Sequence, residues 1–328
     1  MDKTLVIYLV FSAVIIAALA LDLGLLSKKN QKISLKTALF QTVFWVLLSV
    51  AFCAFIWIEN TDGNGKADAI SYISAYLLEW SLSIDNIFVF IIIFSFFKVK
   101  EKNYSRVLLL GILMAIVFRI LFIAIGSAAV ARYEWIMYIF GVFLAYTGIK
   151  MFTSGEDEEF DPETNWAFKF MKKFMRTTDE EPDGQFIIKK EGKTFFTKLA
   201  MVVVMLGLID IVFAVDSIPA VFSIIPDPSK KLLIYSSNIF AVLGLRSLFF
   251  LLRGAASKFD YLQQGIAIVL LFIGVKMLLP LLSEIGVDEK YLHMPVWISL
   301  VVIVVCITGS IVYSIYRKRK EDPVEEAE

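Results

Sequence analysis

The stretch EWSLSIDNIF at residues 79–88 decides the fold, because it places two carboxylates, Glu79 and Asp85, inside a long run of apolar residues. The whole chain has the same character: its 328 residues are 58% hydrophobic and only 20% charged, and the mean hydropathy is +0.74. Soluble domains of this length are far less apolar. The composition therefore predicts an integral membrane protein, in which a charged residue within a span needs a partner or a function.

Nine apolar segments are long enough to cross a hydrocarbon core, which takes about 20 helical residues. They lie at roughly residues 5–26, 35–58, 69–97, 105–127, 133–152, 198–225, 231–252, 260–282 and 294–316. The first segment also has features of a signal peptide, but Asp22 and another apolar turn follow its candidate cleavage site, which favours a span. We predict an all-α polytopic membrane protein with about nine transmembrane helices in a single membrane domain, residues 1–328.

Lys and Arg gather in every second connection between these spans. The basic connections lie at 28–36, 98–106, 150–198, 253–258 and 317–320. Because cytoplasmic loops of membrane proteins carry the excess of positive charge, this pattern predicts that the N-terminus is outside and that the tail at 317–328 is cytoplasmic.

The connection at 153–197 differs from the other loops. Phe168, Met171 and Phe174 recur at helical spacing after Pro162, which predicts a short amphipathic helix along the cytoplasmic face. Autoinhibition or ion sensing by the acidic cluster at 156–159 is the alternative interpretation.

Polar residues recur in the same order in two halves of the chain. EWSLSIDNI at 79–87 aligns with DIVFAVDSI at 210–218, and the order continues with Arg119 against Arg246 and Lys150 against Lys276. The two copies, at 69–152 and 198–282, hold three spans each, preceded by two helices at 5–58 and followed by one at 294–316. Three spans reverse the direction of the chain, so the copies are predicted to be inverted repeats, as in many secondary transporters.

The acids within the spans are the candidate functional residues. A charge at the centre of a membrane helix costs about 2.5–3.5 kcal/mol, so these acids must be protonated, paired with arginine or bound to a cation. The candidate metal ligands are Glu79, Asp85, Asn86, Asp210, Asp216 and Ser217; the candidate charge-compensating residues are Arg119, Arg246 and Lys276; and the candidate accessory residues are Asp22 and Asn238. This all-oxygen ligand set fits Mn²⁺, Mg²⁺ or Ca²⁺ better than copper or zinc. Internal salt bridging that only orients helices is the open alternative.

The six-residue spacing from Glu79 to Asp85 adds an expectation about local structure. Residues six apart differ by about 120° around a straight helix, so the two acids share a face only where the helix breaks. Pro219 is expected to disturb the second copy near Asp216, and Ser81 and Ser83 supply a weaker signal in the first copy.

The motifs YLLEWSLSIDNIFVF, DIVFAVDSIPAVF and FIGVKMLL resemble the TerC family of integral membrane proteins, in particular its Alx-like branch. The likeness covers most of the chain and includes LDLGLLSKK at 21–29. It implies a manganese exporter of the bacterial cytoplasmic membrane, in a family named for tellurite resistance, whose ion path is lined by the residues of the two Asp motifs. One departure is visible: Gly207 stands where many relatives carry Glu, which removes one potential ligand or proton acceptor.

We therefore expect a divalent-cation efflux transporter, for Mn²⁺ in the first place, that works by alternating access within the lipid bilayer with protons as the counter-ion. No permanently bound cofactor, nucleic-acid partner or enzymatic activity is expected, since no nucleophile–base pair or phosphate-binding loop is legible. The alternative is a non-transporting membrane scaffold in a metal or tellurite stress-response or protein-insertion complex. An intramembrane aspartyl protease would also need two aspartates, but neither stands in a Gly-x-Gly-Asp context.

Overall fold

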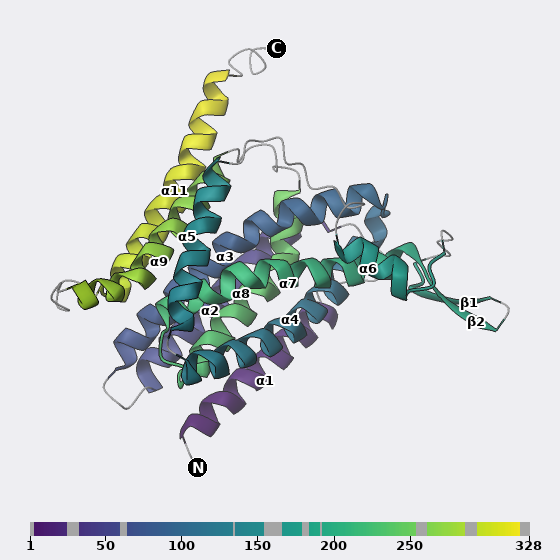
Figure 1. The fold of residues 1–328 in the computed structure, drawn as a ribbon. Helices are drawn as coiled ribbons and strands as arrows, with labels where there is room; N and C mark the ends of the chain where they lie inside the picture. Colours follow the sequence, from purple (N-terminus) through teal and green to yellow (C-terminus); the bar gives the residue numbers. More distant parts are fainter. Residues whose placement is uncertain are drawn as a thin grey trace.

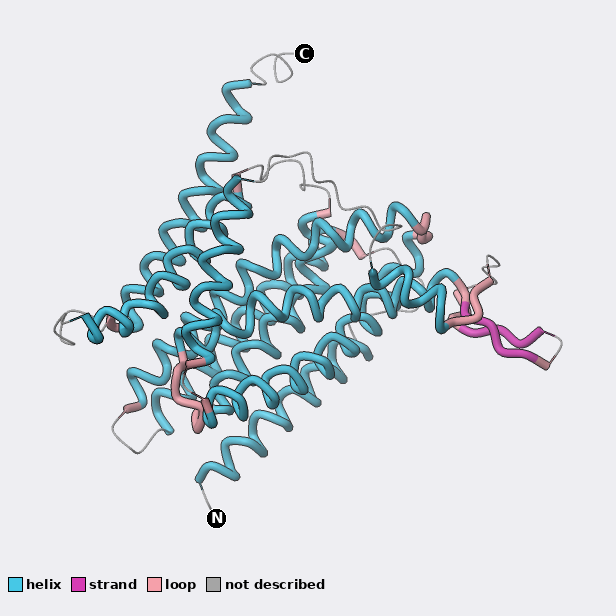
Figure 2. Tube along the Cα trace, viewed as in Figure 1, coloured by secondary structure: helices cyan, strands magenta, loops and turns pink. Residues whose placement is uncertain are grey.

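The described chain is a bundle of long helices with a short β-hairpin projecting at one side (Figures 1 and 2). This computed structural model describes residues 3–24, 33–59, 64–133, 135–153, 166–178, 184–190, 192–253, 261–285 and 294–321. The side chains of Asp22, Asp85 and Asp216 lie outside the described part, although their backbones belong to described helices.

Each of the nine predicted spans is a helix. They are α1 (Lys3–Gly24), α2 (Leu35–Glu59), α3 (Gly65–Phe96), α4 (Glu101–Arg132), α5 (Ile136–Thr153), α7 (Lys198–Ile224), α8 (Lys231–Leu252), α9 (Leu262–Leu278), which the 3₁₀ helix η2 (Leu279–Ile285) extends, and α11 (Val296–Glu321). Within the described residues, seven helices are long and apolar enough to cross a membrane, and α1 and α5 contribute shorter apolar stretches. The predicted all-helical membrane fold is confirmed.

The distribution of apolar side chains fits a bilayer. Large apolar residues on the peripheral helices, such as Leu47, Ile125, Tyr146 and Val305, are at least half exposed. Helix α8, by contrast, is buried along nearly its whole length and occupies the centre of the bundle. Because exposed apolar surface of this extent marks contact with lipid or another protein, the outer surface of the bundle is a hydrocarbon-facing surface.

The two sequence copies, α3–α4–α5 and α7–α8–α9, pack with each other symmetrically. The most extensive contacts join α3 to α8, α4 to α7, and α5 to α9. Helices α3 and α8 run parallel, because Asp68 contacts Lys230 near their starts and Glu79 contacts Asn238 further along both.

Helices α4 and α7 also run parallel, since Gly111 lies against Leu206 and Gly126 against Phe222. Helix α4 follows α3 through a short turn and returns across the bundle, so α7 runs opposite to α3. The first helix of one copy therefore points against the first helix of the other, as inverted repeats require.

Glycines bring α5 and α9 into backbone contact. A Cβ atom on Gly274 would lie 2.5 Å from the backbone nitrogen of Ala145, and one on Gly148 would lie 2.7 Å from the backbone nitrogen of Leu271. Small residues permit this close approach between membrane helices.

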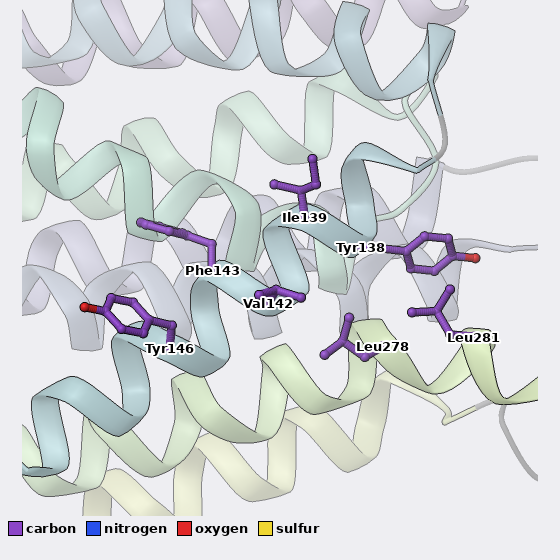
Figure 3. Close-up of a pocket in the computed structure, with 7 residues that line it drawn as sticks. All are labelled: Tyr138, Ile139, Val142, Phe143, Tyr146, Leu278 and Leu281. Carbon is purple, nitrogen blue, oxygen red and sulfur yellow. The ribbon is translucent and has the colours of Figure 1, made fainter.

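A shallow groove of about 470 Å³ runs along the outer side of this helix pair (Figure 3). Its lining residues are Tyr138, Ile139, Val142, Phe143, Tyr146, Leu278 and Leu281. None of them carries a charge, and Glu79 and Arg119 are not among them, so the groove is separate from the candidate residues of the two motifs.

The segment between the two copies contains α6 (Trp166–Phe174), the predicted amphipathic helix. It buries Phe168 and Met171, and the Phe168 ring packs on Phe96 and Phe97 at the end of α3. Phe174 lies on α6 with its side chain outside the described part, while Pro162 and residues 156–159 lie outside the described residues.

Strands β1 (Ile187–Lys190) and β2 (Lys193–Phe196) form an antiparallel hairpin that the sequence reading did not predict. Gly192 in its two-residue turn has φ +73°, a conformation that favours glycine, so the Glu-Gly pair between two short runs was the available signal.

Candidate functional site

Arg119 of α4 is the centre of a buried cluster that joins four helices. Its Nε donates to Asp210 Oδ2 at 2.7 Å and its Nη2 to Asp210 Oδ1 at 3.0 Å, which is a two-point contact with one carboxylate. Its Nη1 donates to Glu79 and to Asn238 Oδ1, the latter at 2.8 Å. Asn238 Nδ2 in turn donates to Glu79 Oε2 at 3.3 Å. Glu79 and Arg119 come from the first copy, Asp210 and Asn238 from the second.

The cluster is shielded from water and carries unequal charge. Arg119 is 2% exposed, and Glu79, Asp210 and Asn238 are 0% exposed. Two carboxylates face one guanidinium, so the cluster has a net charge of −1 when both acids are ionised. A buried ion pair of good geometry offsets its desolvation cost, but the surplus negative charge needs a proton or another cation.

The helices that carry the two acidic motifs are continuous. Both α3 and α7 run unbroken through their motifs, and Pro219 lies inside α7. The expectation of a helix break is therefore wrong. Without a break, Glu79 and Asp85 stay about 120° apart around α3, as do Asp210 and Asp216 around α7, so the six candidate ligands do not all face the same way.

A polar stripe extends from the Arg119 cluster along α3. Ser83 and Asn86 follow Glu79 by four and seven residues, so they lie within about 40° of it around the helix. Ser83 is 0% exposed and Asn86 is 5% exposed.

A corresponding stripe extends along α7, where Ser217 follows Asp210 by seven residues and is 2% exposed. Because α3 and α7 run in opposite directions, the two stripes leave the cluster toward opposite ends of the bundle. Together they form a buried polar line on both sides of Arg119.

Two hydroxyls on these stripes lack the backbone hydrogen bond that many helical serines of the structure make, as does the hydroxyl of Ser127 on α4. Ser74 and Ser81 of α3, for example, donate to the carbonyl four residues earlier, at 2.6 and 2.7 Å. Ser83 Oγ and Ser217 Oγ are buried with no hydrogen-bond partner among the described atoms. Buried polar atoms nearly always have a partner, so these hydroxyls are available to a ligand or water. The sequence analysis did not name Ser83 as a candidate ligand. Its position one helical turn after Glu79 was the feature that could have indicated it.

The three predicted charge-compensating residues have different partners. Arg119 binds both described acids, whereas Arg246 donates to Ser105 Oγ of α4 at 2.9 Å. Lys276 Nζ donates to Ser299 Oγ of α11 at 2.9 Å and contacts the carbonyl of Ser223 at 3.5 Å. Lys276 does not meet Asp210, because Arg119 holds that carboxylate and Lys276 lies near the ends of α7 and α9.

The remaining candidate residues fall in two groups. Asn238 touches both Glu79 and Arg119. Asp22 lies in the last turn of α1, and Asp85 and Asp216 lie on α3 and α7, but their side chains are outside the described part. Among the described side chains, no three His, Cys, Asp or Glu gather into a group that could hold a metal ion.

Gly207, where the resemblance leads one to expect Glu, packs against α4. A Cβ atom on Gly207 would collide with the end of the Met114 side chain. Met114 thus fills the space that a larger residue would take one turn before Asp210.

Residues 64–322 match the family described as "Integral membrane protein TerC family". This chain belongs to the TerC family. It is 37% identical over 317 residues to a Salmonella typhi protein named "Putative membrane-bound redox modulator Alx", covering 95% of this chain and 94% of that protein. The Escherichia coli K12 protein of the same name is 38% identical over 301 residues, 89% of each chain.

A protein from Myxococcus xanthus, named "Uncharacterized membrane protein STKORF319", is 38% identical over 309 residues, 94% of this chain and 92% of that protein. No solved structure matches the chain.

Proposed function

We propose that this TerC-family protein exports a divalent cation, Mn²⁺ in the first place, across the bacterial cytoplasmic membrane by alternating access of its two inverted repeats. The observation that carries the proposal is the buried polar line through Glu79, Arg119 and Asp210, together with the hydroxyls of Ser83 and Ser217, which have no hydrogen-bond partner among the described atoms. A membrane interior that holds ionised and unsatisfied polar groups marks an ion path more often than a purely structural contact.

The oxygen donors along this line determine the class of ion. They are carboxylates, the Asn86 amide and the two serine hydroxyls. Outside this line, Pro219 has no N–H to give to the carbonyl of Val215, which therefore lacks its usual helical hydrogen bond. Hard divalent cations bind such oxygen sets, whereas Cu²⁺ and Zn²⁺ prefer nitrogen and sulfur ligands. The preference for Mn²⁺ over Mg²⁺ and Ca²⁺ rests on the resemblance to Alx-like proteins alone.

The two pairs of acids take different roles in this proposal. Glu79 and Asp210 are held by Arg119 and tie the repeats together at the centre of the bundle. Asp85 and Asp216, on other faces of the same helices, are proposed as the primary ligands of the ion. The surplus charge of the Arg119 cluster attracts a cation or a counter-transported proton, and relaxation of the cluster accompanies the exchange of access between the two sides.

Ion flux into proteoliposomes tests the proposal. The purified protein is expected to move Mn²⁺, with Mg²⁺, Ca²⁺, Zn²⁺ and proton movement measured in parallel. Asp85→Asn and Asp216→Asn are expected to lose the flux, and Glu101→Gln, which neutralises a carboxylate that is 39% exposed, serves as the matched control. Full Mn²⁺ flux in both motif variants refutes the assignment.

A non-transporting scaffold is the second candidate, and the completeness of the Arg119 contacts favours it, since both described acids are already paired. It predicts that Glu79→Gln lowers the folded fraction of the protein and that the wild type moves no ion in any gradient. The transporter predicts flux in the wild type, so the same vesicles separate the two functions.

A further inference from the structure

An ion pair closes one end of the polar line. Lys230 Nζ lies 2.5 Å from Asp68 Oδ1, in the first turn of α3. Asp68 is only 7% exposed. Asp68 belongs to the first repeat and Lys230 to the second, so the contact joins the repeats at the end where α3 and α8 begin. The charge pattern of the loops predicts that this end is the outer one.

Asp68 lies on the same side of α3 as Glu79 of the Arg119 cluster, nearer to the start of the helix. Glu79 follows it by eleven residues, which places the two within about 20° around the helix and about 16 Å apart along it. Between them on this face lie Tyr72 and Ala75, both 0% exposed. The face of α3 that carries Glu79, Ser83 and Asn86 therefore also carries Asp68 near the start of the helix, with the buried residues Tyr72 and Ala75 in between.

The turn before α8 fixes the position of Lys230. The Lys230 backbone N–H donates to the carbonyl of Asp227 at 3.1 Å, and the Lys230 carbonyl accepts from Leu233. Hydrogen bonds from Ser229, first from its side chain and then from its backbone, lower the pKa of Asp227 and keep its carboxylate as part of the turn. Pro226 and Pro228 limit the φ angles of this turn. The lysine is thus delivered to Asp68 by a rigid element.

The ion pair at the opposite end has a more exposed carboxylate, because the side chain of Asp68 is 11% exposed, whereas the Lys230 side chain, at 35%, is as exposed as its counterpart. Arg253 Nη2 lies 2.7 Å from Glu101 Oε1, and the two side chains are 36% and 39% exposed. Pairs in this environment contribute little to stability because water and salt screen them. The carboxylate of Asp68 is enclosed, so its bound ammonium is the stronger closure.

We propose that Asp68 is a second binding position for the transported divalent cation, at the end of the path where α3 and α8 begin, and that Lys230 occupies this carboxylate when the path is closed there. The inference rests on the proposed function and adds a residue pair to it. A hard divalent cation and a lysine ammonium compete for the same carboxylate oxygens. Opening this end requires the pair to part.

Cysteine accessibility at Ala75 tests the closure. In a Cys53→Ala, Cys306→Ala background, Ala75→Cys is labelled with a water-soluble maleimide in detergent. Lys230→Gln is expected to raise the labelling rate about tenfold by increasing the open population. Lys231→Gln, an exposed neighbour, and Arg253→Gln at the other end are the matched controls and are expected to leave the rate unchanged. An equal rate in Lys230→Gln and Lys231→Gln overturns the proposal.

Two further arms separate a binding position from a structural contact. Mn²⁺ alone is expected to slow labelling in Lys230→Gln but not in Lys230→Gln combined with Asp68→Asn, and absence of this difference overturns the binding role of Asp68. The charge swap Asp68→Lys with Lys230→Asp is expected to restore slow labelling. If Ala75→Cys does not purify as a monodisperse protein, Tyr72→Cys, which also lies between Asp68 and Glu79 on this face, replaces it.

Labelling needs no transport, and wild-type flux is measured separately in proteoliposomes. If the wild type shows flux but Lys230→Gln does not accelerate labelling, only the closure by Asp68 and Lys230 is refuted. If the wild type shows no flux, the transport function is refuted.

Discussion

Replacing Arg119 by Leu is expected to be among the most damaging single changes in this protein. The change removes the donors to Asp210 at 2.7 and 3.0 Å and the donor to Glu79, and it leaves two carboxylates of 0% exposure facing each other. Removing one partner of a buried ion pair typically costs about 3–5 kcal/mol, because the other charge stays buried without compensation. We expect a loss in this range in the free energy of unfolding.

Thermal unfolding of the purified protein in detergent measures this loss. A destabilisation of this size corresponds to a fall in Tm of roughly 10 °C for a chain of a few hundred residues. Arg132→Leu is the matched control, because Arg132 ends the same helix, is exposed, and donates to the neighbouring Tyr133 hydroxyl. An exposed substitution of this kind is expected to change stability by about 0.5 kcal/mol or less.

A double-mutant cycle then isolates the contact between Arg119 and Asp210. If the two-point contact stabilises the fold, Arg119→Leu and Asp210→Leu together cost less than the sum of the single changes, by about 1–3 kcal/mol. Strict additivity, or equal Tm values for Arg119→Leu and Arg132→Leu, contradicts the interpretation that this cluster ties the two repeats together.

Gly274→Ala is expected to loosen the α5–α9 contact and cost about 1–3 kcal/mol, since its Cβ meets backbone atoms that cannot move aside; Gly309→Ala, with nothing within 4 Å, is the control in the same Tm assay and is expected to be neutral or stabilising. Ser83→Ala is expected to change the free energy of unfolding by about 0.5 kcal/mol or less, because Ser83 Oγ has no partner among the described atoms to lose, while raising the Mn²⁺ concentration needed for half-maximal flux. The lowered pKa of Asp227 means that its contribution to stability is present above the unfolded value of about 3.9 and is lost as pH falls through the folded value. Asp227→Ala is therefore expected to flatten the acid limb of the stability–pH curve, and an unchanged curve contradicts this.

The sequence alone determined the membrane class, the positions of the spans and the relation between the two copies. Apolar length is a local property of the chain, so each span is visible without knowledge of its neighbours. The order of Glu79, Arg119, Asp210 and Arg246 indicated the repeat, and the three spans in each copy indicated its inversion. The hairpin at 187–196 escaped notice because four-residue strands carry a weak pattern.

Only the tertiary structure decided which acid meets which cation. The separation of Arg119 from Asp210 by 91 residues and from Asn238 by 119 residues gives no pairing rule, because a long side chain at a crossing of four helices can reach several partners. The structure assigned both described acids to Arg119, directed Arg246 to Ser105 and Lys276 to Ser299, and kept α3 and α7 continuous. Sequence fixes the angle between residues on a helix, but packing between helices decides whether the helix bends and where each face points.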